Sequence, residues 1–309
     1  MIVALTGATG FLGRSLCRHL IREGHTVVGW SSRAESAAWA DDLMSEMPAS
    51  VQWRIGRLGR DADVAALVHG CDACIHAGLS RPNASFLDPG PDVHRYWNEN
   101  VGGSLQLLEA CRQEGLRRCI FVSSGAVHDA VIPGMSLDER HPPRPTTLYG
   151  AYKSAVESLF HHYGTSGELV TATVRPTVIY GINAPLASSR WYPLVRQVLE
   201  SETVDVNKGS KSVHVDDVAR SIAICLTSNA VESGGIYNCC DRMISEWEIA
   251  EIANAVSGRG TRIIGTKKQA KNEIVTERLR SLGMTFGGTS RLEATLSDMI
   301  ERIRAGRER

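Results

Sequence analysis

The sequence predicts an α/β fold, with a doubly wound parallel sheet followed by a small, mainly helical C-terminal lobe. Two observations support this prediction. Short apolar runs typical of buried strands alternate with helical patterns, and closely spaced glycines stand between the first run and the first helix. The chain of 309 residues is also long enough to bury a large core in one or two domains.

The alternation of strand-like and helical patterns predicts where the strands and helices lie, and the point where it ends predicts a domain boundary. Beyond Pro176 the rhythm of strand and helix loosens, apart from one further strand–helix unit within residues 213–240. The strand-like runs are residues 2–5, 26–30, 51–55, 73–77, 119–123 and 169–174, and the helical patterns are residues 62–69, 101–115 and 151–163.

We therefore expect two domains. Residues 1–181 and 209–240 should form the sheet domain, and residues 182–208 and 241–309 should form the smaller lobe.

Charge and composition exclude several classes of partner. Lys+Arg and Asp+Glu number 34 each, so no basic surface is expected for nucleic acid or an anionic membrane. No apolar stretch approaches the roughly 20 residues of a membrane span. The first strand begins at residue 2, which leaves no room for a signal peptide. We expect a soluble, cytoplasmic protein.

The eight cysteines are expected to be reduced, apolar core residues. Cys71 and Cys74 have the CxxC spacing of metal and redox sites. However, they lie at the entry to a strand-like run, and no second CxxC exists to complete a zinc site. We therefore expect no metal.

The turn after the first strand carries the strongest functional signal. A strand that passes into a helix through closely spaced glycines lets a pyrophosphate approach the backbone and sit at the positive end of the helix dipole. We expect dinucleotide binding here, and an ordinary tight turn is the alternative. The expected contacts are Gly7, Thr9, Gly10, Phe11, Leu12 and Gly13.

The end of the second strand indicates which dinucleotide binds. An acidic side chain at this place takes the ribose hydroxyls of NAD. Here the strand ends in Ser31, Ser32 and Arg33, whose hydroxyls and guanidinium suit a ribose phosphate. NADP is therefore the first choice and NAD the second; in the alternative interpretation Arg33 is an ordinary surface arginine.

A helix further along carries groups that could catalyse proton transfer. Tyr149 and Lys153 are four residues apart, so their side chains share one helix face. A neighbouring ammonium and a positive nicotinamide favour the phenolate and lower the phenol's pKa towards the working range. Ser124 follows the strand at 119–123 and could bind the substrate oxygen. Asn100 could fix backbone and water near Lys153, with a simple helix cap as the alternative.

Taken in order, these motifs resemble those of the extended short-chain dehydrogenase/reductases, in particular the NAD-dependent epimerase/dehydratase family. The resemblance covers nearly the whole chain. The matching segments are residues 6–13, 76–79, 100–103, 121–127, 149–153, 175–181, 214–219 and 235–238.

The resemblance implies a seven-stranded Rossmann domain that binds NAD(P) and a smaller lobe that binds substrate. It also implies Ser124, Tyr149 and Lys153 as catalytic residues, with Asn100 as a fourth member. A homodimer built from the helices at 101–115 and 151–163 is a further implication. The cofactor contacts beyond the glycine turn would be Leu58, Ala77, Gly78, Asn100, Lys153, Pro176 and Val178.

Departures from the family pattern narrow the chemistry. Gly125 and Ala126 stand where dehydratases carry an Asp-Glu pair, which argues against sugar dehydration. Ser210 replaces an arginine that meets a phosphate in nucleotide-sugar enzymes, which weakens a diphosphate substrate without excluding it. Tyr152 replaces the usual serine before the lysine, and Arg57 stands where an aspartate often contacts adenine.

Candidate substrate contacts are Ser80, Arg81, His128 and Arg190, although each could equally serve packing. The leading hypothesis is an epimerase or ketoreductase that acts on a secondary alcohol or ketone, such as a sugar or nucleotide sugar. An NADPH-dependent reductase of a non-sugar carbonyl compound is the alternative. A non-catalytic NADP-binding sensor is a third possibility. The presence of Ser124, Tyr149 and Lys153 together argues against it.

Overall fold

The computed structural model describes residues 1–31, 51–81 and 88–307, which form two compact units. Ser32 and Arg33 lie outside the described residues. The first unit comprises Met1–Pro176, Ala219–Cys239 and Val275–Met284, and the second comprises Thr177–Val218, Cys240–Ile274 and Thr285–Arg309.

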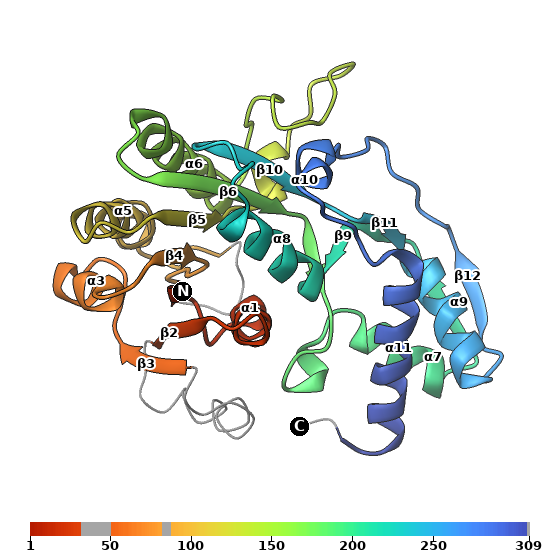
Figure 1. The fold of residues 1–309 in the computed structure, drawn as a ribbon. Coiled ribbons are helices and arrows are strands. Elements are labelled where there is room, and N and C mark those ends of the chain that lie inside the picture. Colours follow the sequence, from red (N-terminus) through yellow and green to blue (C-terminus); the bar gives the residue numbers. More distant parts are fainter. Residues whose placement is uncertain (32–50, 82–87, 308–309) are drawn as a thin grey trace. The chain divides into compact units, whose positions relative to one another are not determined.

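A seven-stranded sheet forms the centre of the first unit (Figure 1). Its strand order is β10-β6-β5-β4-β1-β2-β3, and every neighbouring pair is parallel. The predicted doubly wound parallel sheet is thus confirmed. The strands are β1 (Ile2–Thr6), β2 (Thr26–Ser31), β3 (Val51–Ile55), β4 (Ala73–His76), β5 (Arg118–Val122), β6 (Val170–Pro176) and β10 (Gly235–Cys239).

Helices cover both faces of this sheet. Helices α3 (Asp61–Val68), α5 (Gly103–Gln113) and α6 (Leu148–Ser166) lie beside one another on one face, and α1 (Phe11–Arg22) lies on the other (Figure 1). Under the first three helices, a core joins strand residues such as Phe121 to helix residues such as Leu107, Val156 and Phe160. Burying each large apolar side chain stabilises the fold by about 1.5–3 kcal/mol.

Short elements complete the first unit. They are α4 (Val93–Trp97), the π-helix η3 (Asn98–Gly102), the 3-10 helix η4 (Gly125–His128) and α10 (Glu277–Ser281). Helix α8 (Val215–Thr227) passes from the second unit into the first at Ala219.

Capping explains the limits of α6. Thr147 precedes the helix, and its Oγ1 accepts a hydrogen bond of 3.1 Å from the Gly150 amide. The helix ends at Ser166 and is followed by Gly167, whose φ of +81° lies in the left-handed region that favours glycine. The helix therefore begins three residues earlier than the expected start at residue 151, and Tyr149 lies in its first turn.

All eight cysteines are free thiols and all are buried. The Sγ atoms of Cys74, Cys111 and Cys119 lie within 4.8 Å of one another in the core beneath α5. A hydrogen bond with a neighbouring thiol raises the pKa of Cys74 and Cys111 well above the usual range, and burial does the same for Cys119. A raised pKa keeps these thiols protonated and makes them poor nucleophiles.

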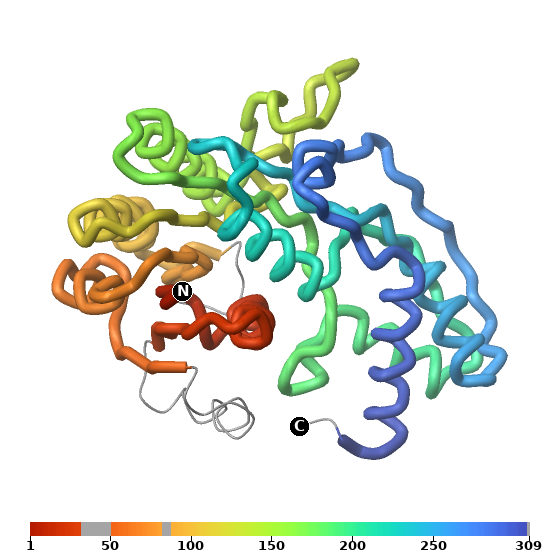
Figure 2. The backbone as a smooth tube through the Cα atoms, in the orientation of Figure 1, coloured from red at the N-terminus to blue at the C-terminus, as the bar shows by residue number. Residues whose placement is uncertain are grey.

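The second unit has its own core of aromatic and aliphatic side chains, including Tyr180, Trp191 and Leu292. Helices α7 (Tyr192–Glu200), α9 (Glu246–Ser257) and α11 (Gly288–Arg304) pack together, as the tube in Figure 2 shows. Short strands accompany them, in the orders β11-β9-β7 and β12-β8. Their bounds are β7 (Val178–Tyr180), β8 (Thr203–Val206), β9 (Gly209–His214), β11 (Arg242–Ser245) and β12 (Arg262–Gly265), and a 3-10 helix, η5 (Leu186–Ser188), lies before α7.

Among the described residues, no helix combines the length and the apolar character that crossing a membrane requires.

Candidate active site

The glycine turn between β1 and α1 brings backbone into direct contact with backbone. Gly7 has a φ of +72°, and a Cβ on it would lie 2.7 Å from the carbonyl oxygen of Ala77. A Cβ on Gly13 would lie 2.0 Å from the carbonyl oxygen of Gly7. No side chain fits at either position without moving the backbone.

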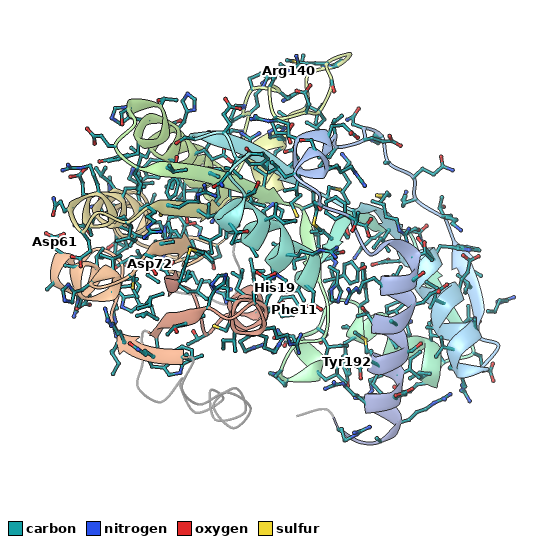
Figure 3. The ribbon with its side chains drawn as sticks, in the orientation of Figure 1. Phe11, His19, Asp61, Asp72, Arg140 and Tyr192 are labelled. Carbon is teal, nitrogen blue, oxygen red and sulfur yellow. The ribbon has the colours of Figure 1, made fainter. Side chains whose placement is uncertain are left out.

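The first turn of α1 suits an anion. Gly10 is the N-cap residue and has no side chain to accept a hydrogen bond from the first amides, and the first turn carries no acidic residue. Thr9 lies just before the cap, and Phe11, labelled in Figure 3, is the first helical residue, followed by Leu12. This cradle fits the pyrophosphate of a dinucleotide.

A series of buried hydrogen bonds fixes the backbone next to the glycine turn. Ser104 Oγ donates to the Asn100 carbonyl oxygen (2.5 Å), so it accepts from His76 Nε2 (2.8 Å). His76 Nδ1 therefore accepts from Thr6 Oγ1 (2.8 Å), which in turn accepts from the Gly78 amide (2.8 Å). With a neutral imidazole, every hydrogen bond in this series has one donor and one acceptor.

The pKa of His76 agrees with that arrangement. Burial, and after it the nearby charge of Lys153, lowers the pKa of this imidazole to about 3. A neutral His76 thus ties β1, β4 and α5 together at the point where Ala77 and Gly78 meet the glycine turn. No role for this histidine was predicted from the sequence, although it is the polar residue inside the apolar run 73–77.

Asn100 lies inside the π-helix η3 and is fully buried. Its Oδ1 accepts from the Ser80 amide (2.8 Å), and its Nδ2 donates to the carbonyl oxygens of Ser80 and Tyr96 (2.8 Å each). The side chain therefore fixes the loop after β4. It does not cap a helix, which was the alternative interpretation.

Of the three residues expected to bind the ribose phosphate, Ser31 at the end of β2 is the one that the structure describes. Ser31 is buried, and its carbonyl oxygen accepts a 3.0 Å bond from the Gly56 amide. Leu58 lies in the loop that follows β3 and packs against the core, where a Cβ on Gly103 would lie 2.9 Å from its Cβ.

Ser124, Tyr149 and Lys153 come together at the end of β5. Ser124 caps η4, with its Oγ accepting from the Ala126 amide (3.2 Å), and it also shares a hydrogen bond with Tyr149. Lys153 Nζ donates to the Val122 carbonyl oxygen (2.7 Å). The serine, tyrosine and lysine that the sequence analysis singled out thus form one cluster.

Aromatic rings surround the lysine of this cluster. Its Nζ lies 4.7 Å from the centre of the Phe121 ring, 4.9 Å from that of Tyr152 and 5.6 Å from that of Tyr149. Tyr152, the residue that departs from the family pattern, is fully buried, and its hydroxyl has no hydrogen-bond partner among the described residues.

Burial controls the ionisation of the cluster. It lowers the pKa of Lys153 to about 7, against the raising effect of the Glu157 carboxylate. It also raises the pKa of Tyr149, while the hydrogen bond with Ser124 lowers that pKa in part. That Lys153 lowers the pKa of Tyr149 stays a prediction, and it requires the protonated form of Lys153, which is only partly populated near neutral pH.

A second buried network, which was not predicted from the sequence, lies beside the cluster. Glu157 and Arg175 form a two-pronged ion pair (2.7 and 2.8 Å) and are 3% and 2% exposed. Ser123 Oγ donates to Glu157 (2.5 Å), and Arg175 donates to His128 Nε2 (2.6 Å). The His128 ring also packs 5.1 Å from that of His141. The available signal was the spacing of Tyr149, Lys153 and Glu157 at intervals of four.

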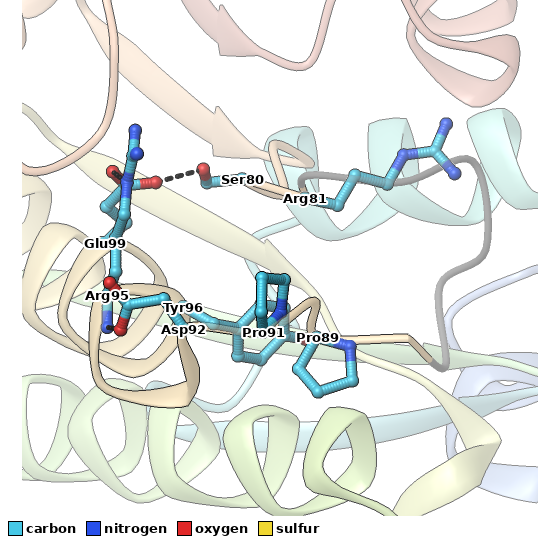
Figure 4. A pocket seen from close by; sticks show the side chains of 8 residues that line it. All are labelled: Ser80, Arg81, Pro89, Pro91, Asp92, Arg95, Tyr96 and Glu99. Carbon is cyan, nitrogen blue, oxygen red and sulfur yellow. Dashed lines mark hydrogen bonds and ion pairs between the residues drawn. The ribbon is translucent and has the colours of Figure 1, made fainter.

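A pocket of about 270 Å³ opens beside η3. Ser80 and Arg81 lie on one side of it, and in Figure 4 the Ser80 side chain is directed towards Glu99, to which it is hydrogen-bonded, while Arg81 extends the other way. Arg95 also pairs with Glu99 (2.7 Å). The remaining lining residues are Pro89, Pro91, Asp92 and Tyr96.

The other predicted contacts lie elsewhere in the chain. Pro176 ends β6 in the first unit, whereas Val178 and Arg190 belong to the second unit. Arg190 donates to Ser210 Oγ (3.1 Å) and lies 5.6 Å from the Trp191 ring. Tyr192, labelled in Figure 3, begins the helix that follows.

Comparison with known proteins identifies the family. A model of the NAD dependent epimerase/dehydratase family matches residues 3–240. The chain belongs to this family. It is therefore an NAD(P)-dependent enzyme of the extended short-chain dehydrogenase/reductase type, as the motifs predicted.

Two curated relatives and one solved structure illustrate the range of similar proteins. A UDP-glucose 4-epimerase of Streptomyces lividans is 29% identical, in an alignment that covers 69% of this chain and 63% of that protein, less than two thirds of its length. Tetraketide alpha-pyrone reductase 1 of Arabidopsis thaliana is 24% identical over 96% of this chain and 94% of its own.

The solved structure is that of a UDP-glucuronic acid 4-epimerase from Bacillus cereus in complex with UDP-glucuronic acid and NAD. It has a TM-score of 0.77 and 22% identity and covers 98% of this chain and 100% of that one. This likeness confirms the fold.

Proposed function

We propose that this enzyme is an NAD(P)-dependent epimerase or ketoreductase that acts on a secondary alcohol or ketone, with a nucleotide sugar as the first choice of substrate. The observation that carries the proposal is the meeting of Ser124, Tyr149 and Lys153 at the end of β5. A serine, a tyrosine and a buried lysine in one cluster can move a proton on a hydroxyl group.

Each member of the cluster has a distinct part. The Tyr149 hydroxyl takes the proton of the substrate hydroxyl or gives it back. Ser124, which shares a hydrogen bond with Tyr149, binds the same substrate oxygen. Lys153 Nζ, held by the Val122 carbonyl oxygen, stabilises the phenolate form of Tyr149 by its positive charge. The nicotinamide, when bound, supplies the hydride exchange with the substrate carbon.

The glycine turn fits that cofactor. Gly7 and Gly13 leave room only for backbone, and Gly10 leaves the first turn of α1 without a side-chain cap, so the pyrophosphate would sit there. NADP remains our first choice because Ser32 and Arg33, the two residues after Ser31, offer a hydroxyl and a guanidinium and no carboxylate. The NAD complex of the Bacillus cereus epimerase and the name of the family support NAD as the second choice.

Two substrate classes are considered, a nucleotide sugar and a non-sugar carbonyl compound, and they give two forms of the proposal. The 4-epimerases among the relatives favour a nucleotide sugar. The match with the Arabidopsis reductase, which extends over nearly the whole chain, supports a reductase of a non-sugar carbonyl compound as second candidate. Gly125 and Ala126 leave a sugar dehydratase without its acidic pair.

Release of bound nucleotide tests these forms. Purified protein is denatured, and any dinucleotide is identified and counted per chain. Near-stoichiometric nucleotide supports an epimerase that recycles its hydride, and its 2′-phosphate content decides between NADP and NAD. Protein that holds none and binds neither nucleotide in a titration would overturn the cofactor assignment.

Replacement of Tyr149 by Phe tests the catalytic part. We expect turnover to fall by about 10²–10⁴-fold, because the proton-transfer group is lost, while nucleotide affinity is kept. The matched control is Tyr163→Phe, which removes a hydroxyl from the same helix at a position where it bonds to Glu109, so turnover should be kept. Unchanged turnover in Tyr149→Phe would overturn the catalytic assignment of Tyr149. A non-catalytic sensor would show no turnover in either protein and would bind nucleotide equally well in both.

We also propose a homodimer built from α5 and α6. Leu107 and Leu108 of α5 are used within the chain's own core, but Leu105 is 40% exposed. Light scattering on the same sample measures the oligomeric state.

A further inference from the structure

Three consecutive residues at the end of β5 are each held by a different residue of α6. The Val122 carbonyl oxygen accepts from Lys153 Nζ (2.7 Å), and Ser123 Oγ donates to Glu157 (2.5 Å). Ser124 shares its hydrogen bond with Tyr149. The helix residues are spaced by four, so the anchoring face of α6 extends one turn beyond the tyrosine and lysine of the proposed site.

Glu157 is bound firmly enough to act as an anchor. Both of its oxygens face Arg175, one of them also accepts the Ser123 hydroxyl, and the pair is almost fully buried. Arg175 is fixed in turn by His128, at 2.6 Å. A buried, charge-assisted pair of this kind has little freedom to move.

We propose that Glu157 is a positioning residue of the reaction: it holds the β5 end that carries Ser124 and stabilises the ammonium of Lys153 one turn away. The inference rests on the proposed function, because it assigns Glu157 a part at that same site. Glu157 touches neither substrate nor cofactor in this role; it acts through Ser123 and Lys153.

The charges around Lys153 support this role. The titratable groups that face it are Tyr149, Tyr152 and Glu157 of α6 and His76 of β4. His76 is neutral, so Glu157 is the carboxylate that opposes the effect of burial on the pKa of Lys153. Within the described residues, Lys153 and Arg175 are the charged or titratable groups that face Glu157, and His128 lies behind Arg175.

The test follows the ionisation of Lys153 directly, by NMR of protein labelled with ¹³C at the lysine side chains. The chain has only six lysines, and the Lys153 signal is assigned by its loss in Lys153→Arg. In Glu157→Gln we expect the titration of Lys153 to move down by roughly one pH unit. The alkaline limb of the turnover profile should move the same way, with a fall in turnover of about tenfold.

Two further variants keep the test decisive. If Glu157→Gln does not fold because it leaves Arg175 without its ion pair, the double variant Glu157→Gln with Arg175→Gln removes both charges and should fold. Ser123→Ala breaks only the bond to the strand, so it should lower turnover about tenfold and leave the Lys153 titration in place. Glu168→Gln, at an exposed position, is the control for both readouts.

An unchanged Lys153 titration and an unchanged pH profile in folded Glu157→Gln protein would overturn the inference and leave Glu157 a structural residue. The NMR titration needs neither substrate nor nucleotide. Failure of the proposed function, seen as full turnover in Tyr149→Phe, is therefore a separate result.

Discussion

The glycine turn after β1 and the end of β5 belong to the same sheet, yet they are built by opposite means. At the turn, Gly7 and Gly13 place backbone within contact of backbone, and the space for a ligand exists because side chains are absent. At the end of β5, Lys153 and Glu157 are charged side chains held in the protein interior. The first region is defined by shape and the second by ionisation.

Because of this difference, we expect substitutions in the first region to affect nucleotide binding and substitutions in the second to affect turnover. A substitution at the turn alters the backbone and should weaken nucleotide binding whatever its chemical character. A substitution at the end of β5 can keep its shape and alter only charge, so it should affect turnover first. Three experiments test this contrast, and each of them could break it.

The largest expected effect is on turnover in Lys153→Met, which should fall by about 10²–10⁴-fold because Tyr149 loses its neighbouring ammonium. Stability at neutral pH should not suffer, since burial disfavours the charged amine and lowers its pKa to about 7. Steady-state kinetics and urea unfolding measure the two quantities. Lys271→Met, at an exposed position, is the control. Loss of nucleotide affinity with turnover intact at saturation would reverse the proposed contrast.

The next effect is on binding. Gly13→Ala places a Cβ 2.0 Å from the Gly7 carbonyl oxygen, so the start of α1 must shift. We expect nucleotide affinity to fall by about tenfold or more, because a displacement of this size costs at least ~1.4 kcal/mol in the bound state. Calorimetric titration with NADPH and NADH measures it. Gly102→Ala, which meets nothing within 4 Å, should bind normally.

The third effect is on the pH dependence of stability, and it comes from His76. Its pKa falls from 6.5 in the unfolded chain to about 3 in the folded protein. Between these values the unfolded chain binds one more proton, so the free energy of unfolding decreases as the pH falls from about 6.5 to about 3. The slope from this group approaches ~1.4 kcal/mol per pH unit.

Removing the imidazole should remove that slope. Urea unfolding of His76→Gln between pH 6.5 and 4 should show a weaker dependence on pH than the parent protein. His94→Gln, at an exposed position, should not. Equal slopes in the parent and His76→Gln would mean that the folded protein does not hold His76 in its neutral form between pH 6.5 and 4.

The sequence predicted the backbone framework well because strands, helices and the glycine turn leave local signals. The runs at 2–5 and 119–123 and the spacing of Gly7, Gly10 and Gly13 follow from the period of a strand and the shape of one turn. The meeting of Ser124 with Tyr149 and Lys153 was also predicted, from the spacing of four between the tyrosine and the lysine and from the resemblance to the family.

The buried polar networks were less accessible to such reasoning. Glu157 and Arg175 are 18 residues apart and meet only because α6 packs next to β6. His76 and Ser104 are similarly joined through the fold and not through the sequence. The substrate contacts depend on side-chain direction. His128, which stays a predicted substrate contact, bonds to Arg175 and packs against a second histidine ring.

The buried thiols also make this protein convenient to label. Every native cysteine is enclosed, and burial or thiol–thiol hydrogen bonding raises the pKa of Cys74, Cys111 and Cys119 well above the usual range. A maleimide dye should therefore react with a newly introduced surface cysteine far faster than with any of the eight. A fluorescent reporter could thus be placed on either unit without first removing a single native residue.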